Sequence, residues 1–456
     1  MKDHKIYKRA LQLAVPMMIQ NGITNAVGLV DNVMVGSLGT ESMTAVSIVG
    51  QLIFVFNLAI FGGLSGPGIY GAQYFGQGNT EGVRNIFRLK WWISLFSLIV
   101  GLGIFIFWGN ELIMLYLRGN DSGIDAAATL GYGRDYMMIM LWGLFPFAVT
   151  QIYSGSLRET GESVKPMVAG VCSVVADIAF NYILIYGKFG FPRLEVRGAA
   201  VATVIARIVE MCVIVIWSHC QREKHLFLQK IYCTMKIPVD MLRTVVKKGL
   251  PIFLNEFLWA GGLAVLTQEY STRGLSVIAG LNISNAICNL LNVVFIAMGN
   301  AVGILTGQML GASQYDKAKR DSVRLMWFTG ALSLVLTVVL VSISGVFPLL
   351  YDTTQEVRDY GRNFIIITSL FFPVQGFLNA LYFTLRSGGK TVITFLFDSV
   401  YTCVVSVPVA FVLCTYTSLP VLTIYTVVQA LDCIKLIVGY VLIKKGVWIN
   451  NLVAES

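Results

Sequence analysis

Charged side chains are scarce in this 456-residue chain, because Asp, Glu, Lys and Arg make up only 13% of it and hydrophobic residues 56%. Soluble proteins carry charge on about a quarter of their residues, so this composition excludes an ordinary soluble domain. The mean hydropathy is +0.71. Apolar runs of roughly 20 residues recur, long enough to cross a hydrocarbon core about 30 Å thick as helices, and they lack the alternation of a membrane barrel. The sequence predicts an all-α polytopic membrane protein.

Signatures of catalysis and metal binding are also missing. The three histidines, His4, His219 and His225, lie outside the apolar runs, and no HExxH, GxSxG or GxxxxGK[ST] sequence occurs. The eight cysteines show no CxxC spacing and lie mostly in apolar runs, as small buried hydrophobes do. We expect no enzyme activity, no bound cofactor and no metal cluster. The net charge of +9 does not indicate a nucleic-acid partner, because the basic residues fall in alternate loops.

Twelve apolar segments are predicted to span the membrane. The longest polar connection, residues 219–249, divides them into two sets of six. We therefore predict an N-lobe over residues 1–218, a cytoplasmic linker loop over 219–244 and a C-lobe over 245–456. The approximate spans are 10–35, 44–72, 86–108, 132–157, 164–187, 197–217, 245–269, 275–307, 322–350, 360–385, 391–415 and 418–443.

The distribution of basic residues predicts the orientation in the membrane. The two termini and the loops on their side of the membrane, together with the adjoining span ends, hold 24 of the 34 Lys and Arg, whereas the opposite loops and span ends hold eight. Cytoplasmic loops carry the excess of Lys and Arg, so both termini are predicted to lie in the cytoplasm of a cell-membrane protein.

Internal similarity between the two halves predicts their symmetry. Two six-helix halves with the same topology are related by a pseudo-twofold axis along the membrane normal, and such parallel repeats enclose a central cavity used for alternating access. Residues duplicated in the loops, among them Gln73 and Gln308, are predicted to tie loops within each lobe. The matching landmarks are Pro16 with Pro251, 71–85 with 306–321, YGR at 132 and 360, and LRETGESV (157–164) with LRSGGKTV (385–392).

Few charges lie inside the spans, where each costs about 2.5–3.5 kcal/mol on insertion scales. Two pairs of opposite charge are spaced three residues apart within a span: Arg207 with Glu210 on the sixth span, and Asp432 with Lys435 on the twelfth. We predict that the two charges of each pair neutralise each other and that the pair has a structural role. A gate remains the alternative for both pairs.

Asp177 and Asn181 form the strongest candidate site, because their spacing of four puts both on one face of the fifth span, near its middle. A buried carboxylate beside an amide can hold a proton or share oxygen ligands with Na⁺. The alternative is an aspartate that is simply hydrogen-bonded inside the lobe. Asn57, on the second span, either completes this site or makes a helix-to-helix hydrogen bond of about 0.6 kcal/mol.

Several motifs together resemble the multidrug and toxic compound extrusion (MATE) family. They are LVDNVMVGSLG, GAQYFGQGN, LRETGESVKP, DIAFNYILIYGKFGFP with RGAAVAT, and GLPIFLNEFLW, in this order along essentially the whole chain. The resemblance implies a cation-coupled exporter of organic, often cationic or aromatic, compounds, built from two six-helix lobes.

The resemblance also implies functional residues. The family's N-lobe cation site matches Asp31, Asp177, Asn181 and Thr203 here. One common family pattern places the asparagine before the aspartate, and this chain reverses that order, so the coupling ion stays open between H⁺ and Na⁺.

Polar residues of the C-lobe are candidates for the substrate cavity. Glu256 lies five residues past Pro251 and matches Asn21 by the repeat offset, and a glutamate on this helix binds cation or substrate in some family branches. A buried hydrogen bond is the alternative for Glu256. Trp259 is a candidate wall on which a flat cation can stack. Asp398 either faces the cavity or ties its helix to a neighbour.

Two other functions remain as alternatives. A flippase for lipid-linked saccharides has a related two-lobe architecture, but it needs a cavity rich in Arg and Lys, and the spans offer mainly Arg207 and Lys435. A membrane-embedded enzyme lacks any supporting motif. As an exporter, the protein is expected to work as a monomer in the lipid bilayer, with small organic substrates as its partners.

Overall fold

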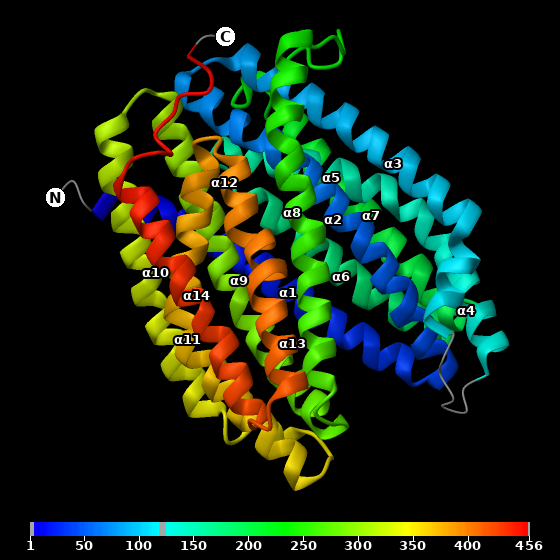
Figure 1. Cartoon of the computed structure of the whole chain (residues 1–456). Coiled ribbons are helices and arrows are strands. Elements are labelled where there is room, and N and C mark those ends of the chain that lie inside the picture. The colour runs from blue at the N-terminus through cyan, green and yellow to red at the C-terminus, as the bar shows by residue number, and fades with distance from the viewer. Residues whose placement is uncertain (1–3, 118–124, 455–456) are drawn as a thin grey trace. The chain divides into compact units, whose positions relative to one another are not determined.

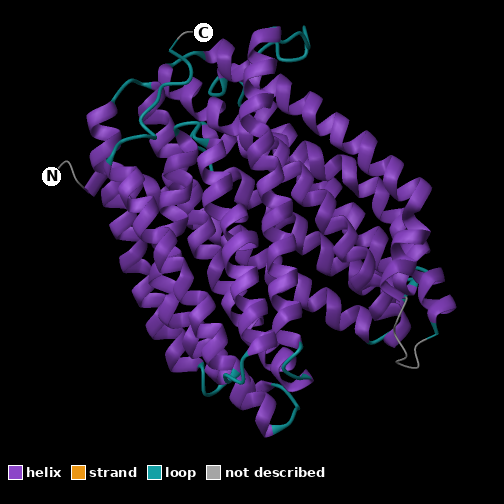
Figure 2. Cartoon of the chain, viewed as in Figure 1, coloured by secondary structure: helices purple, strands orange, loops and turns teal. Residues whose placement is uncertain are grey.

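The computed structural model describes residues 4–117 and 125–454, and these residues form helices joined by turns, without a strand (Figure 2). Figure 1 labels the helices in chain order. Their bounds are α1 (His4–Gly36), α2 (Thr40–Gln77), α3 (Thr80–Leu117), α4 (Ala126–Met140), α5 (Leu144–Glu159), α6 (Val164–Tyr186), α7 (Glu195–Cys220), α8 (Val239–Ser271), α9 (Leu275–Gly311), α10 (Tyr315–Ile343), α11 (Gln355–Ser387), α12 (Thr391–Phe395), α13 (Val407–Tyr416) and α14 (Val421–Lys444).

The helices account for the predicted membrane spans. Within the described residues, 11 helical stretches are long and apolar enough to cross a membrane, and α1, with 33 residues, completes the predicted twelve. The fourth span consists of α4 and α5 joined by the short 3₁₀ segment Leu141–Gly143. The all-α, twelve-helix fold is therefore confirmed.

The ends of several helices differ from the predicted spans. α10 begins at Tyr315, seven residues before the predicted start at 322, because the charged sequence YDKAKRD is helical although hydropathy excludes it. It ends at Ile343, before a turn and the 3₁₀ segment Phe347–Leu350 that contains Pro348. α14 begins at Val421 rather than 418, directly after Pro420. Hydropathy marks the membrane core, whereas charge and proline set the helix ends.

The chain forms two compact units. The N-terminal unit comprises Ile19–Gly71 and Thr80–Arg243, and the C-terminal unit comprises Met1–Met18, Ala72–Asn79 and Thr244–Ser456, as far as these are described. Helices α1 and α2 thus contribute residues to both units. The predicted division at 1–218, 219–244 and 245–456 stays a prediction.

Close helix packing organises each unit. In the N-terminal unit α6 packs along α7, and in the C-terminal unit α9 packs along α11, which also contacts α10 and α14. Gly280 of α9 faces Tyr360 and Gly361 of α11 so closely that an added Cβ would lie 2.5 Å from the Tyr360 Cβ. Small residues at such crossings allow two helix backbones to approach.

The eleventh span departs from α-helical geometry. Between α12 and α13 the chain runs through two π-helical segments, Leu396–Val400 and Thr402–Ser406. A π turn forms i→i+5 hydrogen bonds and occurs frequently at functional sites. Asp398 lies in the first of these segments, so its direction differs from that expected for a regular helix.

Candidate functional site

Three of the predicted site residues meet in the N-terminal unit. The side-chain amide of Asn181, on α6, donates to Asp31 Oδ1 of α1 over 2.9 Å and to Asp177 Oδ2 of α6 over 3.3 Å. Asp177 is 6% exposed and Asn181 1%, whereas Asp31 is half-buried. The amide of Asn181 therefore bridges two carboxyl groups whose positions in the sequence are 146 residues apart.

Two buried oxygen atoms of this cluster have no hydrogen-bond donor among the described residues. Asp177 Oδ1 and Asn181 Oδ1 are buried and accept no hydrogen bond within the described residues. A buried carboxylate is unfavourable unless it is neutralised by a cation or a proton. Carboxylate and amide oxygens are the hard ligands that small cations prefer. The cluster is thus chemically suited to take up one positive charge.

The surroundings of Asp177 come from α4 and α7. Thr203 of α7 lies near the Asp177 carboxyl group, while its hydroxyl donates to the Ala199 carbonyl over 3.1 Å, and Arg207, one turn further along, is a charged neighbour of Asp177. Tyr136 of α4 is 8% exposed and adjoins both Thr203 and the acid pair. Tyr136 could not be singled out from the sequence, because a single tyrosine in a membrane helix is common.

Asn57 of α2 is the remaining predicted member of this site. Its Oδ1 atom is buried without a hydrogen-bond partner, and no hydrogen bond between described residues joins it to Asp31, Asp177 or Asn181. Its contribution to the site stays a prediction.

The two predicted charge pairs differ in the structure. On α14, Lys435 Nζ lies 3.3 Å from Asp432 Oδ1, so the predicted ion pair is confirmed. On α7, Arg207 instead donates to the Gly143 carbonyl over 3.2 Å, and Glu210 accepts from another helix. Arg207 and Glu210 remain electrostatic neighbours, but each of them is bound elsewhere.

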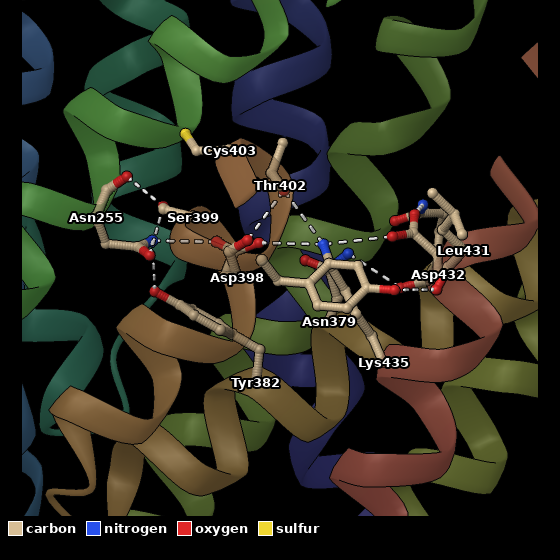
Figure 3. A network of polar contacts seen from close by, with 12 residues as sticks. Asn255, Asn379, Tyr382, Asp398, Ser399, Thr402, Cys403, Leu431, Asp432 and Lys435 are labelled. Carbon is tan, nitrogen blue, oxygen red and sulfur yellow. Dashed lines mark hydrogen bonds and ion pairs between the residues drawn. The ribbon is translucent and has the colours of Figure 1, made fainter. Parts of the chain in front are cut away.

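A polar network in the C-terminal unit joins α8, α11, the eleventh span and α14 (Figure 3). The Asn255 amide donates to Asp398 Oδ2 over 3.1 Å and to the Tyr382 hydroxyl over 3.2 Å. Ser399 Oγ donates to Asn255 Oδ1 over 2.6 Å, and Lys435 Nζ lies 4.0 Å from Asp398 Oδ1. Asp398 therefore ties its helix to two neighbours, which is one of the two roles that the sequence left open. Its role in the substrate cavity stays a prediction.

Asn255 is a network residue that the sequence reasoning missed. It is 3% exposed, while Glu256, the predicted site residue next to it, is only partly buried. The available signal was an amide in an apolar helix, at the position that matches Gln20 by the repeat offset. The charged neighbours of Glu256 are Arg386 and Asp398.

Two further predicted cavity residues stand apart from this network. Trp259 of α8 is 39% exposed, and Asn21 of α1 is half-buried. Neither side chain makes a hydrogen bond to a described residue. Their roles stay predictions.

Comparisons with known proteins give one consistent relationship. The model of the MatE family matches residues 16–183 and 251–412. The chain is 25% identical over 428 residues to YoeA of Bacillus subtilis, a probable multidrug resistance protein, covering 93% of this chain and 91% of that protein. It is 30% identical over 370 residues to NorM of Pasteurella multocida, also a probable multidrug resistance protein, covering 80% and 77%. The solved outward-facing conformation of a multidrug resistance MATE family transporter matches with a TM-score of 0.85 and 20% identity over 97% and 96% of the two chains, which shows the two-lobe fold.

Proposed function

Since this chain belongs to the MatE family of multidrug efflux transporters, we propose that it is a cation-coupled antiporter that exports organic, cationic or aromatic, compounds by alternating access. The protein is a multi-pass membrane transporter for small organic substrates. We place it in the cell membrane as a monomer with both termini in the cytoplasm, as the excess of Lys and Arg in that set of loops supports.

The observation that carries this proposal is the cluster of Asp31, Asn181 and Asp177. Two acids share one amide in an apolar unit, and two buried oxygen atoms accept no hydrogen bond from described residues. An H⁺ or Na⁺ that enters neutralises the cluster and changes which helix arrangement is favoured. A ligand shifts a conformational equilibrium only through its different affinities for the two states. Cation entry from outside therefore favours the state that releases substrate outside.

The substrate side of the proposal uses residues of the C-terminal unit. Glu256 and Asp398 offer carboxyl groups, and Trp259 offers an exposed aromatic face, which together suit a flat organic cation. Asn21 is the matching neutral position of the first span. These assignments follow from the sequence positions and the chemistry of the side chains.

The flippase alternative has less support. It needs free basic groups for a pyrophosphate, but Arg207 donates to a backbone carbonyl and Lys435 pairs with Asp432. The comparisons also do not favour it, since the relatives are multidrug resistance proteins. Members of this family are transporters rather than enzymes.

Transport in energised inverted vesicles tests the proposal. The vesicles accumulate a fluorescent organic cation under an imposed proton gradient or sodium gradient, and the wild type is compared with Asp177→Asn and Asp31→Asn. We expect one of the two gradients to drive uptake in the wild type, and both substitutions to reduce that uptake at least tenfold.

A matched control separates coupling from the general loss of an acid. Asp135 of α4 forms an exposed ion pair with Arg197, so Asp135→Asn removes a carboxylate from the same unit outside the cluster. This variant should transport like the wild type. Gradient-driven uptake that is undiminished in both cluster variants would remove the coupling role of Asp31 and Asp177.

A further inference from the structure

The ammonium group of Lys435 lies among oxygen atoms in the C-terminal unit (Figure 3). Its Nζ atom is 3.3 Å from Asp432 Oδ1 and 4.0 Å from Asp398 Oδ1, and it donates to Thr402 Oγ1 over 3.4 Å. It also lies 5.1 Å from the centre of the Tyr401 ring, a distance typical of a cation–π contact. Carboxylate and hydroxyl oxygens are also the groups that coordinate a bound metal cation. The lysine therefore occupies a position with the chemistry of a cation site.

The charges around Lys435 explain why a cation is needed there. Asp398 and Asp432 bring two negative charges, and Lys435 brings one positive charge, with its side chain 9% exposed. The neighbouring helices add neutral polar side chains, namely Asn255 of α8 and Gln375 and Tyr382 of α11. They also add one acid, Glu256 of α8, and one base, Arg386 of α11, whose charges offset each other. Without Lys435, two carboxylates would face each other in an apolar unit, a costly arrangement.

Asp398 has longer ion-pair and hydrogen-bond contacts than Asp432 has. Asp432 has the shorter contact with Lys435 and accepts a hydrogen bond of 2.6 Å from the Gln375 amide. Asp398 accepts from Asn255 over 3.1 Å, and its ion pair with Lys435 is long, at 4.0 Å. Its side chain is 26% exposed, against 17% for Asp432. An ion that replaced Lys435 would therefore bind chiefly through Asp398.

In the acidic cluster of the N-terminal unit, no described Lys or Arg forms an ion pair with Asp31 or Asp177, although Arg207 is a charged neighbour of Asp177. Asp31, Asp177 and Asn181 supply similar oxygen ligands, but the nearby Arg207 donates its hydrogen bond to the Gly143 carbonyl. Asp177 Oδ1 accepts no hydrogen bond from a described residue, whereas both carboxyl groups of the C-terminal network lie within 4.0 Å of one ammonium. The two units thus have related ligand chemistry and differ in whether a described Lys or Arg forms an ion pair with the acids.

We propose that Lys435 is a built-in cation of the C-terminal unit, which occupies the place of an exchangeable ion between Asp398 and Asp432 and so confines the coupling cation to the N-terminal unit. The second half of this statement rests on the proposed function, whereas the first does not. Lys435 is thereby the residue that sets the number of cations exchanged.

The test measures cation-dependent stability in a protein whose N-terminal cluster is disabled. In the Asp177→Asn background, Lys435→Met removes the ammonium and keeps the side-chain length. Melting temperatures are recorded for the purified full chain with NaCl against choline chloride at constant ionic strength, and separately on acidification without Na⁺. We expect Lys435→Met to gain a saturable stabilisation of a few degrees by one of these cations, because a ligand that binds only the folded state raises the melting temperature.

Further variants identify the site and guard against misfolding. Asp398→Asn added to Lys435→Met should abolish the gained stabilisation, and Lys435→Arg, which keeps the charge, should never show it. If Lys435→Met does not fold, Lys435→Met with Asp432→Asn keeps the net charge of the network and should show the same gain.

Two results would overturn the inference. The first is a folded Lys435→Met variant, in the Asp177→Asn background, that responds to neither Na⁺ nor acid. The second is an Asp177→Asn protein with Lys435 intact that already responds through Asp398. The proposed function has a separate mode of failure. If the wild type and Asp177→Asn transport alike, and Asp177→Asn responds to the cation only after Lys435→Met is added, the coupling role of Asp177 fails and the role of Lys435 stands.

Discussion

Asp177 and Asn181 could be predicted as a pair, because a spacing of four residues puts both side chains on one face of a helix whatever the rest of the fold does. The contact of Asn181 with Asp31 required the packing of α1 against α6, for which only the family resemblance gave a hint. The network around Asn255 and Asp398 was not predictable, because the π-helical segments change the side-chain directions that a regular period assumes.

Lys90 and Glu159 form a buried ion pair that lies outside both candidate sites. Lys90 Nζ lies 2.6 Å from Glu159 Oε2, with the lysine side chain 1% and the glutamate side chain 12% exposed. Glu159→Gln leaves the Lys90 charge buried without its partner, so we expect a loss of about 3–5 kcal/mol in stability. Thermal unfolding of the purified protein measures this loss.

The exposed pair of Arg197 and Asp135 supplies the comparison. Its side chains are 63% and 43% exposed, so Asp135→Asn should cost less than about 1 kcal/mol. Equal losses in Glu159→Gln and Asp135→Asn would contradict the importance of burial.

The stability of the folded protein is expected to depend on pH through His225, which lies in the loop between α7 and α8. Burial, and then the neighbouring Lys224 ammonium, lower the pKa of His225 below its usual value of about 6.5. The unfolded chain therefore binds this proton more readily than the folded protein does. The stabilising contribution is complete above about pH 6.5 and is lost as the pH falls from there through the lowered pKa of the folded state.

Replacing His225 with a residue that cannot take up a proton tests this predicted loss of stability at low pH. His225 packs edge-on against Trp217 and Phe227, so His225→Phe preserves an aromatic ring at that position. Melting curves over the acidic range should fall less steeply for His225→Phe than for the wild type. The same slope in both proteins would show that His225 does not contribute.

At the scale of elements, hydropathy predicted every membrane helix, but the helix ends followed other rules. α2 and α3 extend beyond their predicted spans of 44–72 and 86–108, to Thr40–Gln77 and Thr80–Leu117, because their polar ends remain helical outside the apolar run. The 3₁₀ segment Leu141–Gly143 and the π-helical segments were also not predicted, because hydropathy does not report the hydrogen-bond pattern inside a helix.

The duplicated Gln-x-x-Gly sequence joins the end of α2 to the end of α9 within the C-terminal unit. A Cβ on Gly76 would lie 2.0 Å from the Gln308 carbonyl oxygen, and a Cβ on Gly311 would lie 1.9 Å from that of Gln73. Gln73 also donates to the Ser387 carbonyl over 2.8 Å, so it ties the end of α2 to the second half of the chain rather than to a loop of its own predicted lobe. The repeat thus forms a reciprocal backbone contact that only glycine permits.

Gly76→Ala tests this contact. The added methyl group meets backbone atoms that cannot rotate away, so we expect a loss of about 1–3 kcal/mol in stability. Gly50, on the same helix, is the control, because an added Cβ there meets nothing within 4 Å. Gly50→Ala should leave the melting temperature unchanged or raise it slightly, since alanine favours helix. A loss of equal size at both positions would contradict the close contact.

At the scale of the whole molecule, the sequence predicted the two related halves from their repeats, and the fold comparison agrees with a two-lobe architecture. The halves differ in charge chemistry, with an acid pair bridged by Asn181 in one unit and acids around Lys435 in the other. For the proposed coupling, a membrane potential of about 150 mV contributes about 3.4 kcal/mol for each net charge that moves inward per transport cycle, and one such charge supports a substrate concentration ratio of roughly 300.

Substrate-driven counterflow of the cation is the most direct measurement of the coupling site. The purified protein is reconstituted in liposomes, an outward gradient of organic cation is imposed, and inward movement of H⁺ or Na⁺ is followed with an ion-sensitive dye. The account predicts that the substrate gradient drives one of these ions against its own gradient in the wild type and in Asp135→Asn, and that Asp177→Asn binds substrate but moves no ion. Uphill ion movement of wild-type size in Asp177→Asn would contradict the assignment of the coupling site.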